Sequence, residues 1–480
     1  MKNIKKQPTR RQFVRTLAGS SLALTLSCSL ISRKKKKPNI VFVFGDQWRA
    51  QATGYAGDPN VRTPNLDEFA DRCIRFTNAV SGCPVCSPYR ASLMTGQYPL
   101  THGVFLNDVT LNPAANSIAK ALKQAGYDTG YIGKWHLDGH GRSNFIPKER
   151  RQGFEYWRAM ECTHDYSNSY YYADENIKLK WPGYDAVAQT KEAQKYIRDH
   201  GDGRPFALFL SWGPPHAPYQ TAPEKYRRLF DPDRIKLRPN VPEQFHDRAR
   251  KDLAGYYAHI AVLDECLGAI VRTLQETKLD GNTILVFTSD HGDMLYSQGM
   301  TKKQKPFEES ACIPLLLRYP AVHADRGRLM EIPFNTPDIM PTLLGLCHID
   351  IPASVQGTDF SPVLRGSGTI DRQAVLLTCP SPFGQWTRKR GGKEYRGVRT
   401  RRYTFVRDLN GPWLLYDNKQ DPFQIHNLCN DPHYAELQAT LNSQLNALLQ
   451  ETGDEFLPGQ EYIKRWGYTV DENGTVPYTI

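Results

Sequence analysis

Residues 39–47 read NIVFVFGDQ, in which an apolar, strand-favouring run ends in glycine, aspartate and glutamine. A continuous apolar run of this length, closed by turn residues, is typical of a strand that is buried on both faces of a sheet. Three further runs have the same form and also end in polar residues: 127–132, 206–210 and 283–287. These four segments predict the central strands of one sheet.

Helical patterns lie between these strands. Residues 117–125 predict a short helix, with Ser117 as its N-cap and Gly126 just past its end. Residues 252–277 predict a long helix, because apolar side chains recur every three or four positions from Leu253 to Leu274. Strands that alternate with helices indicate an α/β layer fold with a largely parallel sheet.

The pattern changes after about residue 366. Short β-like runs at 403–406 and 413–416 alternate with turns, and an amphipathic helix is predicted over residues 434–449. A chain of 480 residues is long enough for one large core and one small core. We therefore expect an export signal and basic linker at 1–37, a catalytic domain at 38–365 and a smaller C-terminal subdomain at 366–480.

The positive charge of the chain is concentrated at its start. The formal net charge is +11, and residues 1–37 contain eleven basic residues and no acidic ones. Residues 38–480 then contain 50 basic and 50 acidic residues. A nearly neutral body gives little support to nucleic acid as a partner.

The first 37 residues have the composition of a targeting segment. Residues 9–15, TRRQFVR, precede a mild apolar run at 17–31 that is too short to cross a hydrocarbon core of about 30 Å comfortably. The paired arginines followed by Phe13 resemble a twin-arginine export signal, and an ordinary secretion signal is the alternative. Cys28 is a poor match to a lipidation site. The prediction is an exported periplasmic or extracellular protein without a stable transmembrane anchor.

The polar residues at the strand ends are candidates for one site, because ligands of α/β folds bind beyond the carboxyl ends of strands. Taken singly, Asp46 could cap a helix, His136 or His216 could be a buried histidine, and Asp290 could form a turn. Two carboxylates at one edge repel unless they share a proton or a cation, and Gln47 adds a neutral oxygen for a hard cation.

Lysine and histidine side chains surround this predicted metal site. Lys134, Lys303, His136 and His216 add positive or proton-carrying groups. Such a site suits a sulfate or phosphate ester, whose leaving oxygen needs an acid.

Residues 81–99, SGCPVCSPYRASLMTGQYP, contain two overlapping signatures. Cys83 and Cys86 form a C-x-x-C pair, which is typical of redox or zinc chemistry. Cys86, Pro88 and Arg90 form a C-x-P-x-R run. Structural zinc needs two more ligands that are not visible, and a redox pair leaves Pro88 and Arg90 unexplained. A helix predicted at 89–95 places Cys86 near a positive dipole end.

Residues 86–96 resemble the signature of the type I sulfatases, which belong to the alkaline-phosphatase-like superfamily. The resemblance extends from residue 38 to about 431 and includes PNIV at 38–41, TPNLD at 63–67, GKWH at 133–136, PHAPY at 215–219 and SDHGD at 289–293. It implies a large mixed, mostly parallel sheet flanked by helices, with a C-terminal domain of antiparallel sheet plus helix. It also implies that a separate modification enzyme oxidises Cys86 to formylglycine, whose hydrated aldehyde attacks sulfur.

The resemblance assigns roles residue by residue. Cys86 is the nucleophile precursor and Arg90 its stabilising partner. Calcium is held by Asp46, Gln47, Asp290 and His291, with the formylglycine completing the shell. Lys134 and His136 bind sulfate, whereas His216 and Lys303 lie near the leaving oxygen, with His216 as the acid. Gln47 and His291 depart from the family, in which many members have a carboxylate and an amide at these positions.

The substrate class is less constrained by the sequence. Residues 163–172, followed by Trp181, are rich in aromatic and polar groups that suit sugar rings. We expect a sulfated glycan, with His164 as a specificity residue, and the alternative is a tyrosine-rich loop packed on itself. Two other functions stay open: a phosphoester or phosphonate ester hydrolase of the same superfamily, and a non-catalytic glycan- or anion-binding protein with unmodified Cys86.

Overall fold

The computed structural model describes residues 36–201 and 203–478. The predicted export signal, its paired arginines and Cys28 lie outside the described residues. Residues 38–201 and 203–478 belong to one compact unit. The predicted domain boundary at 365/366 stays a prediction.

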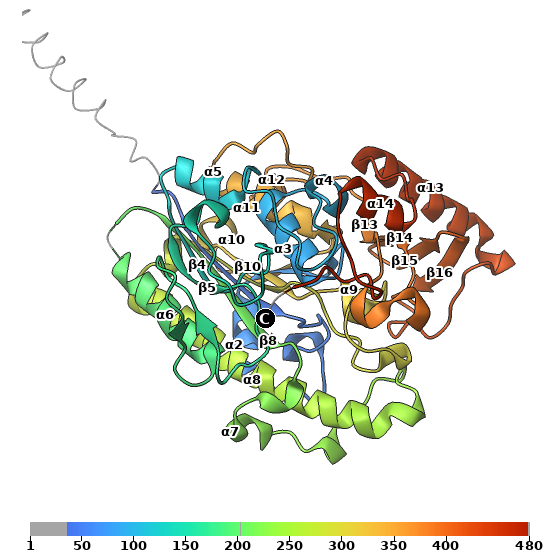
Figure 1. Cartoon of the computed structure of the whole chain (residues 1–480), viewed down its shortest axis with the longest axis horizontal. Helices are drawn as coiled ribbons and strands as arrows, with labels where there is room; N and C mark the ends of the chain where they lie inside the picture. Colours follow the sequence, from blue (N-terminus) through green and yellow to red (C-terminus); the bar gives the residue numbers. More distant parts are fainter. Residues whose placement is uncertain (1–35, 202, 479–480) are drawn as a thin grey trace, which may run out of the picture. The chain divides into compact units, whose positions relative to one another are not determined.

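Eight strands form the main sheet, in the order β11-β2-β10-β9-β1-β8-β4-β5 (Figure 1). Their bounds are β11 (Arg328–Met330), β2 (Ile74–Phe76), β10 (Leu315–Arg318), β9 (Thr283–Ser289), β1 (Asn39–Asp46), β8 (Phe206–Pro215), β4 (Asp128–Lys134) and β5 (Tyr156–Met160). Strands β9, β1, β8, β4 and β5 are parallel, whereas β10 is antiparallel to both β9 and β2. The predicted mixed, mostly parallel sheet is confirmed, and the four predicted strands are adjacent at its centre.

Helices cover both faces of this sheet (Figure 1). Both faces need cover because the side chains of β1 alternate between two hydrophobic cores. Ile40, Phe42 and Phe44 face one core, and Val41 and Val43 face the other. The first core includes α3 (Cys86–Thr95), α5 (Ile118–Gln124) and α11 (Ile339–Leu346), and the second includes α2 (Pro64–Asp71), α6 (Asp185–Asp199) and α8 (His246–Glu276). The shorter helices are α4 (Pro99–His102), α7 (Glu224–Arg227), α9 (Glu308–Ala311), α10 (Pro320–His323) and α12 (Ser361–Leu364).

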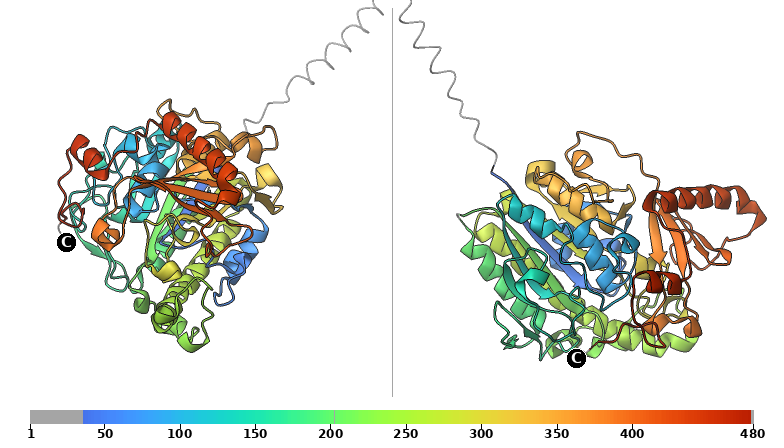
Figure 2. Two further views of the ribbon diagram at one scale, coloured as in Figure 1. Left: turned by 90° about the vertical axis from the view of Figure 1, so that its right-hand side faces the viewer. Right: turned by 45° about the horizontal axis from the view of Figure 1, so that its top comes forward.

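A second sheet lies in the C-terminal part of the chain. It is antiparallel, in the order β13 (Ala374–Cys379), β14 (Tyr395–Thr400), β15 (Tyr403–Asp408) and β16 (Gly411–Asp417). Helix α13 (Ala435–Thr452) covers one face through Leu441, Leu445 and Leu449, as the right view of Figure 2 shows. This arrangement confirms the predicted sheet-and-helix unit. Two small ribbons pair β3 (Ala79–Val80) with β12 (Phe334–Asn335), and β6 (Tyr170–Tyr171) with β7 (Leu179–Lys180).

Two helices begin earlier than predicted, and one helix was not predicted. Helix α3 begins at Cys86, not at residue 89. Helix α8 begins at His246, not at residue 252, because its first turns are polar and mostly exposed and therefore carry no apolar repeat. A last helix, α14 (Gly459–Arg465), was not predicted, since it is short and buries mainly Tyr462 and Ile463. By contrast, Ser117 is the N-cap of α5 as expected, and its Oγ accepts a hydrogen bond from Lys120 N at 3.2 Å.

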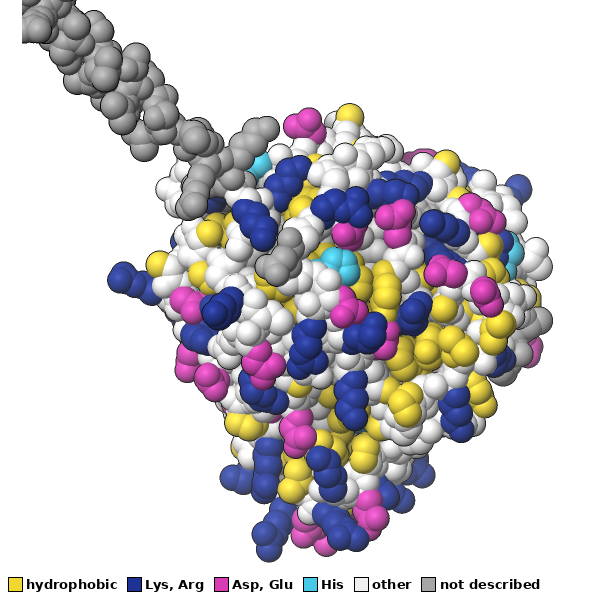
Figure 3. Space-filling model, turned by 90° about the vertical axis from the view of Figure 1, so that its left-hand side faces the viewer, with side chains coloured by type: hydrophobic (Ala, Val, Ile, Leu, Met, Phe, Trp, Pro, Cys, Tyr) yellow, Lys and Arg dark blue, Asp and Glu magenta, His cyan; other side chains and the backbone are white. Residues whose placement is uncertain are grey.

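Surface charge and helix hydrophobicity are relevant to two predicted absences, a nucleic-acid partner and a transmembrane anchor. Figure 3 shows one face on which Lys and Arg side chains are interspersed with Asp and Glu. In residues 36–201 and 203–478, no helix has both the length and the apolar character needed to cross a bilayer.

Candidate active site

The four central strands deliver their polar ends to one edge of the main sheet. Strand β1 ends at Asp46, β4 at Lys134, β8 just before His216 and β9 just before Asp290. Because these strands are neighbours and parallel, their carboxyl ends meet. The structure therefore brings the predicted site residues together, and all of them are buried except His164, which is half-buried.

Cys86 is the first residue of α3, and its thiol lies among charged groups. Its Sγ is 2.9 Å from Lys303 Nζ, 3.3 Å from His291 Nε2 and 3.7 Å from Asp46 Oδ1. Burial and Asp46 oppose ionisation, but Lys134 and Lys303 hold the pKa of the Cys86 thiol well below its ordinary value. Cys83, in contrast, has a pKa raised to about 12 by burial, and it is a free thiol. Cys86 is likewise not in a disulfide, so the C-x-x-C pair is not a disulfide.

Arg90 lies one turn further along α3 and connects the strand ends. Its Nη2 is 3.4 Å from Asp46 Oδ2 and 3.2 Å from Asp290 Oδ2. Its Nη1 donates to the Lys134 carbonyl and to Ser211 Oγ, both at 2.7 Å. The guanidinium also lies over the Phe44 ring, 5.0 Å from its centroid. This buried arginine therefore offsets the negative charge of both carboxylates and fixes their separation.

Four side chains of the site are close enough together to hold a metal ion. One donor atom from each of Asp46, Cys86, Asp290 and His291 lies within 4.8 Å of the others. Gln47 Oε1 is buried and has no hydrogen-bond partner among the described residues, while Gln47 Nε2 donates to Asp293 Oδ2 at 2.7 Å. The amide is thus held with its oxygen available as a ligand.

The two central carboxylates have different electrostatic surroundings. Burial and the neighbouring Asp46 raise the pKa of Asp290 to about 6. Burial also opposes the ionisation of Asp46, but Lys134, with its Nζ 2.5 Å from Asp46 Oδ2, holds the pKa of Asp46 well below its usual range. A cation between them would relieve the repulsion that raises the pKa of Asp290.

His136 and His216, two of the predicted histidines, have different neighbours. His136 Nε2 is 3.3 Å from Asp108 Oδ1, while its Nδ1 is buried without a partner in the described chain. Burial lowers the pKa of His136, but Cys162 and Asp108 outweigh it and raise that pKa to about 9. His216 is stacked on His164, with ring centroids 4.3 Å apart, and burial and Lys303 hold its pKa well below the ordinary value. His164, the predicted specificity residue, therefore touches the site directly.

Lys303 is positioned by the residue that follows it. Gln304 Nε2 donates to the Phe383 carbonyl at 2.9 Å, and Phe383 N donates to Gln304 Oε1 at 3.2 Å. Gln304 N donates to the Pro84 carbonyl, two residues before Cys86, at 3.1 Å. Gln304 has φ +76°, a strained conformation that persists only where its surroundings hold it. Contacts with the C-terminal part of the chain therefore fix the loop that presents Lys303 to Cys86.

Replacing Gln304 with Met should lower kcat about tenfold on substrates with poor leaving groups, because Lys303 loses its support. In a Lys303→Ala background the same change should add less than about twofold, since interacting sites are non-additive. The control is Gln298→Met, because Gln298 also has a positive φ, of +56°, and donates to the Phe423 and Gln424 carbonyls. Equal losses in both variants, or fully additive losses with Lys303→Ala, would show that Gln304 serves stability alone.

Several residues that support the site were not predicted from the sequence. Ser211, Asp108 and Gln304 each support a predicted residue from a distant segment. Asp293 lies inside the SDHGD motif, but its role in orienting Gln47 follows only from the fold. The SDHGD motif could have drawn attention to Asp293. A motif does not, however, show which side chain a carboxylate will contact.

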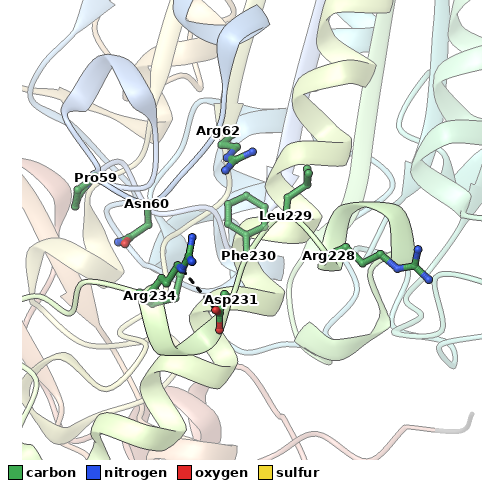
Figure 4. Close-up of a pocket in the computed structure, with 9 residues that line it drawn as sticks. Pro59, Asn60, Arg62, Arg228, Leu229, Phe230, Asp231 and Arg234 are labelled. Atoms are coloured by element: carbon green, nitrogen blue, oxygen red, sulfur yellow. Dashed lines mark ion pairs between the residues drawn. The ribbon is translucent and has the colours of Figure 1, made fainter.

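Two of the surface cavities have charged side chains in their walls. One, of about 530 Å³, is lined by His164, Cys162 and neighbouring loops. The other, of about 400 Å³, is lined by Arg62, Arg228 and Arg234, but Figure 4 shows that these side chains do not converge. Arg228 pairs with Glu224, and Arg234 lies 3.7 Å from Asp231. The first cavity therefore adjoins the site, and the second is not a convergent anion site.

Comparison with known proteins agrees with this geometry. The family model described as Sulfatase matches residues 38–349, and the model for the C-terminal part of N-sulphoglucosamine sulphohydrolase matches residues 297–451. An ulvan-active sulfatase of Formosa agariphila is 42% identical, over 95% of this chain and 92% of its own. An endo-4-O-sulfatase of Bacteroides thetaiotaomicron is 30% identical, over 88% of this chain and 94% of its own.

A solved structure from work on glycosaminoglycan metabolism by Bacteroides thetaiotaomicron has a TM-score of 0.80 and 30% identity, covering 90% of this chain and 99% of its own. The sequence relatives and the shared fold extend over nearly the whole described chain. The protein is a sulfatase and belongs to the type I sulfatase family of the alkaline-phosphatase-like superfamily.

Proposed function

We propose that the protein removes sulfate from a sulfated glycan, using a formylglycine made from Cys86 and a calcium ion held by Asp46, Gln47, Asp290 and His291. The observation that carries this proposal is the position of Cys86 Sγ, which lies 3.7 Å from Asp46 Oδ1 on one side and 2.9 Å from Lys303 Nζ on the other. The cysteine of the C-x-P-x-R run thus stands between the carboxylates and a positively charged group.

The side chains of the site would divide the work between anion binding and proton transfer. Formylglycine supplies the nucleophile, and calcium supplies positive charge that favours ionised oxygen. Arg90 keeps Asp46 and Asp290 apart, and Lys134 and His136 bind the sulfate oxygens. His216 Nδ1 lies 2.7 Å from the Ala217 carbonyl, so its Nε2 is free to serve the leaving oxygen beside Lys303. Because its pKa is low in the free protein, His216 acts as an acid only when the anionic substrate raises that pKa.

A glycan substrate is favoured by the loop that contacts the site. His164 belongs to the aromatic and polar segment at 163–172 and is stacked on His216. Relatives named for activity on ulvan and for endo-4-O-sulfatase activity support the same substrate class. Aromatic faces and polar tips are the usual way in which proteins bind sugar rings.

Sulfate monoesters should be hydrolysed at least about a hundredfold faster than phosphate monoesters with the same leaving group, because differential binding of the transition state sets such ratios. The measurement compares kcat/KM for the two esters on one preparation. Faster turnover of the phosphate or phosphonate ester would favour the alternative hydrolase of the same superfamily.

Maturation is part of the proposal. Cys86 is 1% exposed, so a modification enzyme would have to convert it before folding buries it. We propose that this occurs in the cytoplasm and that export to the periplasm or beyond follows by the twin-arginine route. Mass spectrometry of the Cys86 peptide from the native host should show a species about 18 Da lighter, since an aldehyde oxygen replaces the thiol sulfur and two hydrogens are lost. A fully retained thiol would instead indicate a non-catalytic binding protein.

A further inference from the structure

Two residues that line the cavity of about 530 Å³ beside the site lead to the proposed catalytic groups His216 and His136. His164, in one wall, is stacked on His216. Arg142, in another wall, pairs with Asp108, which contacts His136. A ligand in this cavity would therefore lie next to the sulfate-binding groups. The volume is in the range of ordinary ligand pockets.

Arg142 is held rigidly and keeps donors free. Its Nε and Nη2 donate to the two oxygens of Asp108, at 2.8 and 2.7 Å, and its guanidinium lies 3.5 Å from the centroid of the Tyr478 ring. Nη1 has no hydrogen-bond partner in the described part of the chain, and the side chain is 19% exposed. A fixed guanidinium with a free edge is well suited to a planar or tetrahedral anion.

Lys178 provides a second positive charge in the same cavity. It is exposed, and its Nζ lies 5.5 Å from the centroid of the Tyr170 ring. It forms no ion pair with the described residues. Asp165 is the one acidic lining residue found in the described chain, and its Oδ1 accepts a hydrogen bond from Asn168 N at 3.0 Å. The cavity thus presents two cations, one of them without an acidic partner.

We propose that this cavity binds a second anionic group of the substrate, a carboxylate or a further sulfate carried on the saccharide, through Arg142 Nη1 and Lys178. This inference rests on the proposed glycan sulfatase function and specifies it. The catalytic site would hold the ester that is cleaved, while the cavity would select chains that carry another negative charge nearby.

The test measures binding without turnover, by calorimetry on the full chain. Three saccharides of equal length that lack a cleavable sulfate ester are compared: a neutral one, one with a uronate carboxylate, and one with a sulfate at a position that the enzyme does not cleave. We expect the charged saccharides to bind about tenfold more tightly than the neutral one. The carboxylate and sulfate arms then show which anion the cavity takes.

Two variants locate the effect. Lys178→Gln should reduce the preference for charged saccharides about fivefold, as expected for one partly exposed charge. Arg142→Lys should reduce it about twofold, because a lysine keeps the charge but loses the paired donors of the planar guanidinium. Lys180→Gln is the matched control, since Lys180 is exposed, lies in β7 and does not line the cavity. It should leave the preference unchanged.

Equal binding of charged and neutral saccharides would overturn the inference. A preference that survives both variants would also overturn it, because the charge would then be bound by Lys134 and Lys303 in the catalytic site. Sulfate release from sulfated saccharides is measured separately on wild-type protein. Absence of release would count against the proposed function, whereas the calorimetric preference judges the cavity alone.

Discussion

Replacing Cys86 with alanine should abolish sulfate release, lowering kcat by at least about 10⁴-fold. The side chain at position 86 is the precursor of the proposed nucleophile, and no other cysteine of the described chain belongs to the carboxylate and histidine cluster. Only the remaining binding and charge-stabilising groups would then contribute to catalysis. The measurement is kcat on a saturating sulfate ester, together with the melting temperature of the variant.

Cys83→Ser is the matched control. Cys83 lies three residues earlier and is also buried, but burial raises the pKa of its thiol to about 12, and it is not part of the cluster. This variant should retain at least about half of the wild-type activity, because the change removes little more than a small buried group. Loss of activity in Cys83→Ser with retention in Cys86→Ala would restore the C-x-x-C hypothesis.

Removal of calcium should lower activity by at least about a hundredfold and should lower the melting temperature by several degrees. Without a cation, Asp46 and Asp290 are two buried carboxylates in contact with His291, and burial together with repulsion from Asp46 raises the pKa of Asp290 to about 6. A ligand at a thousand times its dissociation constant stabilises the folded state by about 4 kcal/mol. Adding calcium back after chelation should restore both activity and melting temperature.

The variant Gln47→Met tests whether calcium acts at the proposed ligands. Gln47 Oε1 has no protein partner in the described chain, so its removal costs the metal a ligand. The calcium-dependent rise in melting temperature should become smaller at a fixed calcium concentration, because the dissociation constant is larger. A melting temperature that chelation and calcium leave unchanged would contradict the assignment of these residues as a calcium site.

Much of the fold and the chemistry of the site could be predicted from local patterns. The run at residues 39–47 predicts a buried strand because every side chain from Ile40 to Phe44 is apolar, and both faces of β1 are in fact covered. Its polar end predicted Asp46 and Gln47 as site residues. The start of α8 was missed because its first residues are mainly polar and show no apolar repeat. Such a segment cannot be distinguished from a loop by hydrophobic periodicity.

The supporting contacts could not be predicted, because they join segments that are distant in the chain. Asp108 contacts His136, Gln304 contacts Phe383, and Arg142 reaches Tyr478. None of these pairs belongs to a shared motif or a periodic pattern. Their partners are chosen by how loops pack, which depends on the whole set of elements around them.

By itself, the sequence determined the α/β class, the strands that lie at the centre of the sheet, and the acids, lysines and histidines at their ends. It did so because hydrophobic periodicity and motif spacing are local properties. The tertiary structure alone decided that Cys86 meets both Lys303 and His291, and that His164 is stacked on His216. Parallel strand order and loop packing bring residues more than 200 positions apart into contact. A local sequence pattern cannot predict such a contact.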